Sequence, residues 1–324
     1  MAVGREKHMQ KHMDKRKVTI IGAGHVGSHV ALALVYEGVA DEIVLVDKVE
    51  GKADAQALDA SDAVSYMNHE VVVRGGDYSD VEDSQVVVCA IGQARKPGQN
   101  RVDMLDDSIV MCDELLESLS PYQFPGVLIS ITNPCDVIVD YLRRGLGLPT
   151  ERAFGTGTSL DTARLRRVMS EMTGVSRTSA QGFVMGEHGE SSMIPYSLIR
   201  VGGRGFDDFG LSRDDVLEQV RQGGWIVVTG KLCTEFGIGR AATELVEAVL
   251  RDEKKVLPAS VLLDGQYGET GVQIGVPCVV GAGGIEQIVE VDMTTDELAA
   301  FKSSCDVVRG NVQIALSKGT RGVE

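Results

Sequence analysis

The sequence lacks long apolar stretches. Nowhere in its 324 residues is there a run of about 18 apolar residues, the length that a membrane-spanning helix needs, so we expect no transmembrane segment. The N-terminus is polar and mixed in charge, without the apolar core of a signal peptide. These absences predict a cytoplasmic protein.

Cysteine is sparse and unpaired. The six cysteines are far apart in the sequence and form no CxxC pair or other spacing typical of zinc ligands. They are Cys89, Cys112, Cys135, Cys233, Cys278 and Cys305. The pattern indicates free, mostly buried thiols in a reducing compartment, and it predicts no metal site.

Basic residues are in the minority, with 32 lysines and arginines against 47 aspartates and glutamates and a net charge of −15. Such an acidic chain is unsuited to non-specific binding of nucleic acid or of an anionic membrane surface. Hydrophobic residues make up 43% and charged residues 24%, which is typical of soluble globular proteins. An anionic substrate would therefore require arginines concentrated at its binding site.

From residue 17 onward, short apolar runs alternate with helical patterns. The expected strands are 18–21, 43–46, 71–73, 86–91 and 127–131, and the expected helices are 26–37, 52–66 and 102–119. Apolar strands separated by helices predict a parallel sheet covered on both faces. We expect an α/β fold with a doubly wound Rossmann domain in residues 17–154, preceded by a disordered arm or expression remnant in residues 1–16.

The pattern changes after residue 155. Helices are expected at about 160–172, 213–222, 225–250 and 294–317, and a strand is expected at 180–185. The helix at 225–250 is predicted to break near Gly237 and Gly239. Two apolar runs, 256–263 and 272–280, flank the dipeptide Asp264-Gly265 and predict a hairpin. Residues 155–324 therefore predict a mixed α+β domain that binds the substrate.

A glycine-rich turn follows the first expected strand. The hexapeptide Gly22-Ala23-Gly24-His25-Val26-Gly27 has the GxGxxG spacing and opens a helix, which is the context in which this spacing binds dinucleotides. The first glycine permits the tight turn, the second leaves room for a pyrophosphate, and the third allows the helix to pack closely on the strand. Backbone N–H groups at the helix N-terminus, including those of His25 and Val26, are expected to face the phosphates.

The second expected strand ends in Asp47, twenty residues after Gly27. A carboxylate at this place accepts hydrogen bonds from the adenosine ribose hydroxyls and repels a 2′-phosphate. The next residue is Lys48 and not an arginine, so we favour NAD over NADP. The alternatives are another dinucleotide such as FAD, or a glycine-rich turn without a ligand.

His188 is the candidate acid–base residue. It is the last histidine of the chain, it follows an expected strand, and it lies between Glu187 and Gly189. An imidazole exchanges protons near neutral pH. Asp161 and Arg164, three residues apart at an expected helix start, project from one helical face.

Two loops add further polar groups. The segment from Gly92 to Arg101 is rich in donors and contains Arg95. Asn133 follows the fifth expected strand, at the carboxyl edge of the sheet, where ligands of open α/β sheets bind.

These segments, in this order, resemble the L-lactate/L-malate dehydrogenase family over nearly the whole chain. The resemblance implies hydride transfer between NAD and a small 2-oxo or L-2-hydroxy acid. It implies that His188 donates and accepts the proton and that Asp161 binds its other ring N–H. It also implies that Arg164 grips the substrate carboxylate with a bidentate fork, that Arg101 polarises the reacting carbonyl, and that Asn133 lies near the nicotinamide ribose.

The resemblance leaves the substrate open. Arg95 falls on, or one place from, the position that discriminates substrates in the family, where arginine is typical of malate enzymes and glutamine of lactate enzymes. Glu187 and Thr234 are typical of lactate enzymes. Residues 157–164 and the segment around Trp225 are similar to the L-lactate and L-2-hydroxyisocaproate branches. We expect lactate or a related L-2-hydroxy monocarboxylate, with malate as the alternative.

Regulation and assembly follow from the same resemblance. The family forms dimers or tetramers, so we expect a homodimer or homotetramer. Some lactate enzymes are activated by fructose 1,6-bisphosphate, and Arg166 matches a basic residue of that site. Gln181 stands where a histidine is expected, so we predict weak or no activation. A non-catalytic NAD-binding redox sensor is the alternative from another class, but it has no need of the His188 and Asp161 pair.

Overall fold

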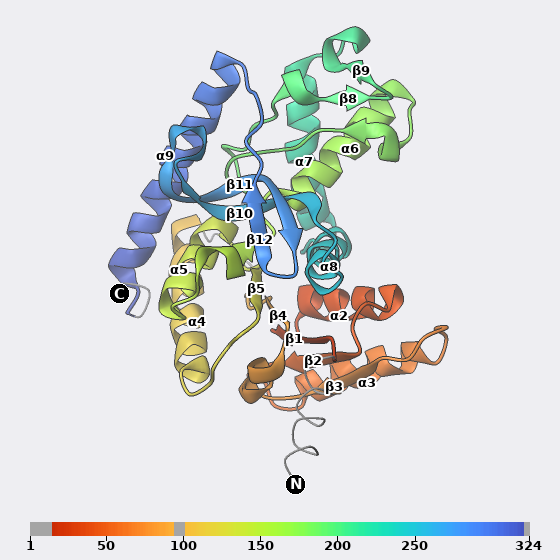
Figure 1. Ribbon diagram of the computed structural model, residues 1–324, viewed down its shortest axis with the longest axis vertical. Coiled ribbons are helices and arrows are strands. Elements are labelled where there is room, and N and C mark those ends of the chain that lie inside the picture. The colour runs from red at the N-terminus through yellow and green to blue at the C-terminus, as the bar shows by residue number, and fades with distance from the viewer. Residues whose placement is uncertain (1–14, 94–100, 321–324) are drawn as a thin grey trace.

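A computed structural model describes residues 15–93 and 101–320 of the chain. Its main feature is a nine-stranded sheet with the strand order β12-β11-β10-β6-β5-β4-β1-β2-β3 (Figure 1). Strands β1 to β6 pair with one another in parallel, and β10 to β12 extend the sheet from β6 in antiparallel fashion. The predicted arm, apart from residues 15 and 16, lies outside the described residues.

The parallel part of the sheet follows the predicted alternation of strands and helices. The strands are β1 Lys17–Ile21, β2 Glu42–Val46, β3 Val72–Gly75, β4 Val86–Cys89, β5 Val127–Ser130 and β6 Ala153–Gly155. The helices are α2 His25–Glu37, α3 Lys52–Val64, α4 Arg101–Leu119 and α5 Cys135–Gly145. The doubly wound α/β fold is therefore confirmed.

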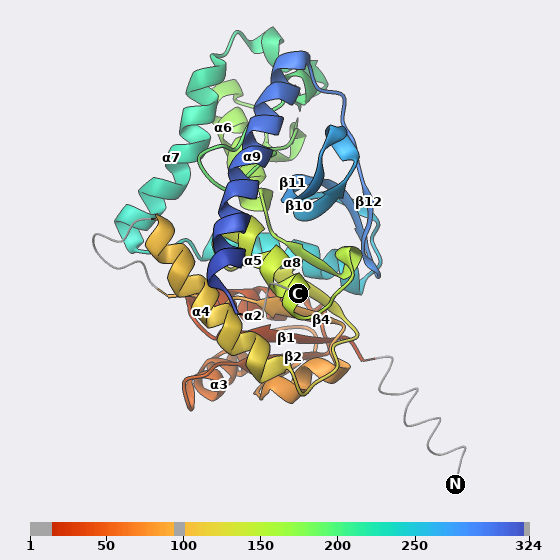
Figure 2. The same ribbon diagram turned by 90° about the vertical axis from the view of Figure 1, so that its left-hand side faces the viewer.

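Successive residues of the central strands pack on opposite faces of this sheet. Ile20 and Val88 are buried in a cluster with α2, α3 and the later helix α8 (Phe236–Leu250), whereas Ile21 and Val87 are buried in a second cluster with α4 and α5. In Figure 2, α4 and α5 lie in front of the strands. Because helices cover both faces, the central strands are mostly apolar on both sides, which explains the apolar runs in the sequence.

The second part of the chain contains helices and antiparallel strands. The helices are α6 Ser159–Thr173, α7 Arg213–Lys231, α8 and α9 Thr295–Lys318, and the strands are β7 Ala180–Gln181, β8 Arg200–Val201, β9 Arg204–Gly205, β10 Lys255–Asp264, β11 Thr270–Gly281 and β12 Gly284–Ile288. β10 and β11 form the predicted hairpin, and Ser260 of β10 pairs with Gly155 of β6. α9 begins at the N-terminal end of the expected range 294–317, because Thr294 caps it: the Thr294 hydroxyl accepts the Glu297 N–H.

The predicted helix break near Gly237 and Gly239 is wrong. α7 continues unbroken to a turn at Leu232, whose φ is 74°, and α8 begins at Phe236. Both glycines lie inside α8, where a methyl group on Gly239 would come within 3.2 Å of His29 on α2. The glycine therefore permits close packing of α2 against α8 instead of ending a helix.

The strand predicted at 180–185 is shorter than expected. β7 ends at Gln181 because Gly182, with a φ of 144°, turns the chain out of the extended conformation. Met185 then forms a single antiparallel bridge with Met193. The strands β6, β8, β9 and β12 were not predicted, since none of them contains the apolar run that marked the longer strands.

The strand order reverses between β1 and β4, which defines a switch point at the carboxyl edge of the sheet. Gly22, after β1, faces Ala90, after β4, so closely that a methyl group on Gly22 would lie 2.6 Å from the Ala90 carbonyl oxygen. Ligands of doubly wound sheets bind outside such a point.

All six cysteines lie within the described residues and are free, as predicted. Five are buried and Cys233 is partly exposed. In residues 15–93 and 101–320, we find no helix that is both long and apolar enough to cross a membrane.

Candidate active site

The glycine-rich turn lies between the end of β1 and the start of α2. Gly22 has a φ of 104°, and its N–H donates to the Val46 carbonyl oxygen at 2.7 Å. A methyl group on Gly27 would lie 1.9 Å from the Gly22 carbonyl oxygen, so α2 packs directly on the turn. A methyl group on Gly24 would meet no atom within 4 Å. The turn therefore combines tight packing with the open space that a pyrophosphate requires.

Asp47 lies beside this turn, at the end of β2. Its Oδ2 accepts the Ala23 N–H at 2.9 Å and lies 3.1 Å from Lys52 Nζ, while Oδ1 accepts the Val49 N–H at 2.9 Å. Burial would raise the pKa of Asp47, but hydrogen bonds from Val49 and Lys52 outweigh it and hold this pKa below its ordinary value. The side chain is thus an ionised acceptor next to the glycine turn.

The residues present fit NAD better than NADP. The ionised Asp47 would repel a 2′-phosphate, as the sequence predicted. Lys48, which could otherwise offset this repulsion, pairs with Glu114 at 2.8 Å. The turn and Asp47 together therefore suit a dinucleotide whose adenosine ribose carries free hydroxyls.

The side chains of His188 and Arg164 both bind the carboxylate of Asp161. Asp161 and Arg164 lie in the first two turns of α6, whereas His188 lies in the loop that follows β7. His188 Nδ1 donates to Asp161 Oδ2 at 2.6 Å, and Arg164 Nη1 donates to Asp161 Oδ1 at 2.7 Å. An ionised carboxylate only accepts hydrogen bonds, so Nδ1 carries the proton toward it and Nε2 is available for exchange.

The electrostatics of this group favour a protonated imidazole. Attraction by Asp161 raises the pKa of His188 above its ordinary value, although burial opposes the shift. Burial would raise the pKa of Asp161, but the charges of His188 and Arg164 lower it. The His188 side chain is 25% exposed. It can therefore hold a proton near neutral pH and reach a ligand from a mostly enclosed position.

Asp136, at the start of α5, holds the His188 backbone and was missed by the sequence analysis. Its Oδ2 accepts the His188 N–H at 2.8 Å, and its Oδ1 accepts the Ser260 hydroxyl at 2.5 Å. Burial raises the pKa of Asp136 to about 6, against the opposing effect of these two hydrogen bonds. The sequence does contain a signal for this role, because Asp136 is a charged residue inside the apolar stretch 135–139. A buried carboxylate needs hydrogen-bond partners, so its position indicates a polar contact inside the fold.

Glu187 fixes the loop that carries His188. Its N–H donates to Ser304 Oγ at 2.8 Å, and its carboxylate accepts the N–H and the hydroxyl of Ser191 at 3.1 and 2.6 Å. A methyl group on Gly189 would lie 2.6 Å from Glu187 Cδ, so the loop folds tightly around this carboxylate. A glycine in place of Glu187 could not make the side-chain contacts.

Arg164 also packs closely against α7. A methyl group on Gly224 would lie 3.2 Å from both terminal nitrogens of the Arg164 guanidinium. A methyl group on Gly223 would lie 3.6 Å from Arg164 Cδ. The glycine pair thus leaves room for the guanidinium beside the helix backbone.

The structure describes some of the other predicted site residues and leaves others outside its described part. Asn133 is exposed at the carboxyl end of β5, and its carbonyl oxygen accepts the Ser108 hydroxyl at 2.9 Å. Thr234 is half-buried in the turn between α7 and α8. Arg101 is the first residue of α4, but its side chain lies outside the described part of the structure, and Arg95 lies outside the described residues altogether.

Comparisons with known families and sequences agree with this geometry. The NAD-binding domain of lactate/malate dehydrogenases matches residues 16–155, and their α/β C-terminal domain matches residues 158–319. The L-lactate dehydrogenase of Fusobacterium nucleatum subsp. nucleatum is 35% identical over 94% of this chain and 98% of its own length. L-lactate dehydrogenase 1 of Bifidobacterium longum is 36% identical over 92% of this chain and 97% of its own.

Solved structures show the same likeness. The minor L-lactate dehydrogenase from Enterococcus mundtii in its ligand-bound form has a TM-score of 0.89 and 32% identity, covering 93% of this chain and 98% of its own. The lactate dehydrogenase from Cryptosporidium parvum complexed with lactic acid and nicotinamide adenine dinucleotide has a TM-score of 0.87 and 29% identity, with 93% and 98% coverage. The malate dehydrogenase from Salinibacter ruber has a TM-score of 0.87, 32% identity and the same coverage.

The class of protein follows from these findings together. A Rossmann sheet that suits NAD, combined with a histidine–aspartate pair and an arginine, defines an NAD-dependent oxidoreductase that acts on the CH–OH group of 2-hydroxy acids. The chain belongs to the lactate/malate dehydrogenase family. The predicted family, enzyme class and cofactor are therefore confirmed, and family membership favours the enzyme over the redox sensor.

Two glycine substitutions in the turn should separate coenzyme binding from folding. Gly24→Ala adds a methyl group to the open space above the turn, so we expect NADH to bind at least about tenfold more weakly while the melting temperature stays unchanged. Gly27→Ala places the methyl group against the Gly22 carbonyl and should lower the melting temperature. Fluorescence titration with NADH and a thermal melt measure both effects. Unchanged NADH affinity in Gly24→Ala would place the dinucleotide elsewhere.

Proposed function

We propose that this enzyme is an L-lactate dehydrogenase that reduces pyruvate to L-lactate with NADH and catalyses the reverse reaction with NAD. The observation that carries the proposal is the Asp161 carboxylate, which holds His188 and Arg164 side by side. The pair offers one proton donor and one cation to a small acid with a carbonyl next to its carboxylate. The relatives named L-lactate dehydrogenase support the same assignment.

His188 is the proposed acid–base residue of the reaction. Its protonated Nε2 donates to the carbonyl oxygen of the 2-oxo acid, and in reverse the neutral imidazole removes the hydroxyl proton. Bound NADH supplies the hydride that reaches the carbonyl carbon. Asp161 stays ionised throughout, stabilises the imidazolium and keeps Nδ1 as the anchored nitrogen, which directs Nε2 to the substrate.

Arg164 is the proposed anchor for the substrate carboxylate. A guanidinium can give two parallel hydrogen bonds to a carboxylate, a geometry that lysine cannot copy. The bond from Nη1 to Asp161 fixes the plane of the Arg164 group. We assign Arg101 to the negative charge that develops on the carbonyl oxygen and Asn133 to the nicotinamide side of the site.

The substrate proposal rests on Glu187 and Thr234. Both match the lactate branch, and Glu187 makes side-chain contacts that shape the catalytic loop. Malate is the second candidate because of Arg95, which could pair with a second carboxylate, and because the Salinibacter ruber malate dehydrogenase has the same fold. A buried arginine without such a carboxylate would be costly. Arg95 therefore separates the two substrates.

Assembly and location are proposed from the same reasoning. Leu58 and Tyr66, on and after α3, are exposed large apolar side chains that an interface between subunits would cover. We propose a homodimer or homotetramer, as the family resemblance implies. Free cysteines are consistent with the proposed cytoplasmic location.

Substrate preference is the direct test of the proposal. We expect kcat/KM to be highest for pyruvate or 2-oxoisocaproate and lower for oxaloacetate, measured by NADH oxidation. An oxaloacetate preference above about tenfold, or about 1.4 kcal/mol in transition-state binding, would replace lactate with malate. In that case Arg95→Gln should restore the preference for pyruvate, which would identify Arg95 as the cause.

Asp161→Asn should move the pH dependence of the reaction. Pyruvate reduction needs protonated His188, so its rate falls as pH rises through the raised pKa of that group. Without the Asp161 charge this pKa drops, and the falling limb of kcat/KM should shift to lower pH. We also expect kcat to fall about 100-fold or more, because the imidazolium loses its stabilising charge.

His188→Asn is the matched control for this profile. It should remove the falling limb and most turnover, while NADH still binds with wild-type affinity. If Asp161→Asn left the limb at its original pH, the two side chains would not form the acid–base pair.

Gly224→Ala should weaken substrate binding without weakening the fold. Its methyl group crowds the Arg164 guanidinium, so we expect KM for pyruvate to rise about 3- to 10-fold, while alanine itself favours the helix over glycine. Gly230→Ala, in the same helix but with no atom within 4 Å, is the control and should leave KM unchanged. Equal KM values in the two variants would show that Arg164 does not hold the substrate.

A further inference from the structure

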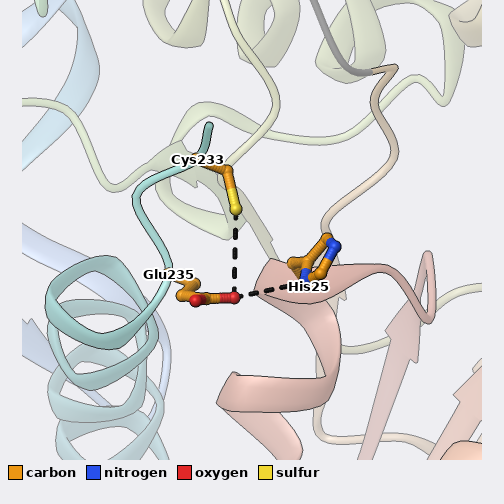
Figure 3. Close-up of side chains that lie close together, drawn as sticks. All are labelled: His25, Cys233 and Glu235. Atoms are coloured by element: carbon orange, nitrogen blue, oxygen red, sulfur yellow. Dashed lines mark hydrogen bonds and ion pairs between the residues drawn. The ribbon is translucent and has the colours of Figure 1, made fainter. Parts of the chain in front are cut away.

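We propose that His25, Cys233 and Glu235 form a binding site for a divalent transition-metal ion, for which Zn²⁺ is the best match. The three side chains come from two segments about 200 residues apart in sequence: His25 from the start of α2, and Cys233 and Glu235 from the turn between α7 and α8. Figure 3 shows the imidazole and the thiol directed at the same Glu235 oxygen. The proposal is independent of the substrate of the enzyme.

The distances between the three groups suit one shared ion. His25 Nδ1 lies 3.2 Å from Glu235 Oε2, Cys233 Sγ lies 3.9 Å from the same oxygen, and all three ligand atoms lie within 4.8 Å of one another. Zinc bonds of about 2.0–2.3 Å in tetrahedral geometry place nitrogen about 3.4 Å and sulfur about 3.6 Å from oxygen. Both distances to Glu235 Oε2 are thus within a few tenths of an ångström of these values, whereas His25 Nδ1 and Cys233 Sγ, which lie within 4.8 Å of each other, close to about 3.6 Å when they share the ion.

Glu235 is prepared as a ligand through one oxygen. Its Oε1 pairs with Lys231 Nζ, while Oε2 faces His25 and Cys233 and also lies 3.5 Å from His29 Nδ1. The Glu235 side chain is mostly buried, and its carboxylate is held by the Lys231 ammonium. Because Lys231 already holds the Glu235 carboxylate in place, less conformational entropy is lost when the ion binds.

Neighbouring residues support the site, and solvent can reach it. His29, one turn after His25 on α2, donates from Nδ1 to the His25 carbonyl oxygen at 2.6 Å, and its ring packs edge-on against Phe236. It thereby fixes the start of α2 in the way that outer groups orient metal ligands. The His25 side chain is 79% exposed, which leaves an entry path. Of the six cysteines, all described, Cys233 alone is not buried.

The ligand types select the class of ion. A thiolate, an imidazole and one carboxylate oxygen suit Zn²⁺ and similar transition metals, whereas Mg²⁺ and Ca²⁺ prefer oxygen ligands only. Three protein ligands leave the fourth tetrahedral position to water. The chain was not expected to bind a metal because its cysteines show no zinc spacing, but spacing along the sequence cannot reveal ligands that only the packing of α2 against α8 brings together.

Binding would link two functional segments of the enzyme. His25 belongs to the glycine-rich turn, and Thr234, the proposed pocket residue, lies between Cys233 and Glu235. An ion held by all three ligands joins the coenzyme turn of the Rossmann sheet to the turn that precedes α8. Because only the folded chain brings these ligands together, the ion should also raise the melting temperature.

Titration of the full chain with Co²⁺, followed by competition with Zn²⁺, tests the proposal. We expect one Co²⁺ per chain, with a thiolate-to-cobalt charge-transfer band in the near ultraviolet that Zn²⁺ abolishes. His25→Ala and Cys233→Ser should each weaken binding at least tenfold, and Cys233→Ser should remove the band. Glu235→Gln replaces the third ligand with a side chain of the same size and should also weaken binding. With three separate ligand variants, the test does not depend on the folding of any one of them.

The control concerns a second pair of histidines in the sequence. His8 and His12, four residues apart and outside the described residues, could bind a metal by themselves. Replacing both with alanine should leave the charge-transfer band and the stoichiometry unchanged. The proposal is overturned if no such band appears, if the band survives in Cys233→Ser, or if the His8→Ala/His12→Ala variant alone loses the ion.

Discussion

The Asp161 carboxylate is the group on which the geometry of the candidate active site depends. One of its oxygens accepts from His188 and the other from Arg164, so a single ionised group sets the position of an imidazole and of a guanidinium. A carboxylate this well buried is tolerated because both oxygens face positive partners. Moving either partner would leave the other beside an uncompensated charge, which is why the three residues act as a unit.

Close backbone packing brings the turn before α8 to the glycine-rich turn. α2 rests on the glycine-rich turn because Gly27 has no side chain, and α8 rests on α2 because Gly239 has none. The turn before α8 carries Thr234, so the same contacts place this proposed pocket residue near the start of α2. The net negative charge of the chain does not affect the position of Arg164, since Asp161 holds this arginine locally.

The sequence predicted best where a physical rule links residues that are close in the chain. The apolar runs gave the parallel strands, the spacing of Asp161 and Arg164 gave their common helical face, and Thr294 gave the start of α9. It failed where the outcome depends on distant packing. Gly239 was taken for a helix break although it serves a contact with α2. Asp136 was missed because its partners, His188 and Ser260, lie 52 and 124 residues away.

Asp136 and Asp161 show how two buried carboxylates near one imidazole can differ in protonation. Asp161 faces two positively charged partners, and its pKa is lowered; Asp136 faces a hydroxyl and a backbone N–H, and burial raises its pKa to about 6. Uncharged donors cannot offset the cost of burying a charge as cationic partners do. Asp161 therefore stays ionised to a lower pH than Asp136 does, and Asp161 is the carboxylate that binds His188 Nδ1 directly. Nε2 is the ring nitrogen that this contact leaves available for proton exchange.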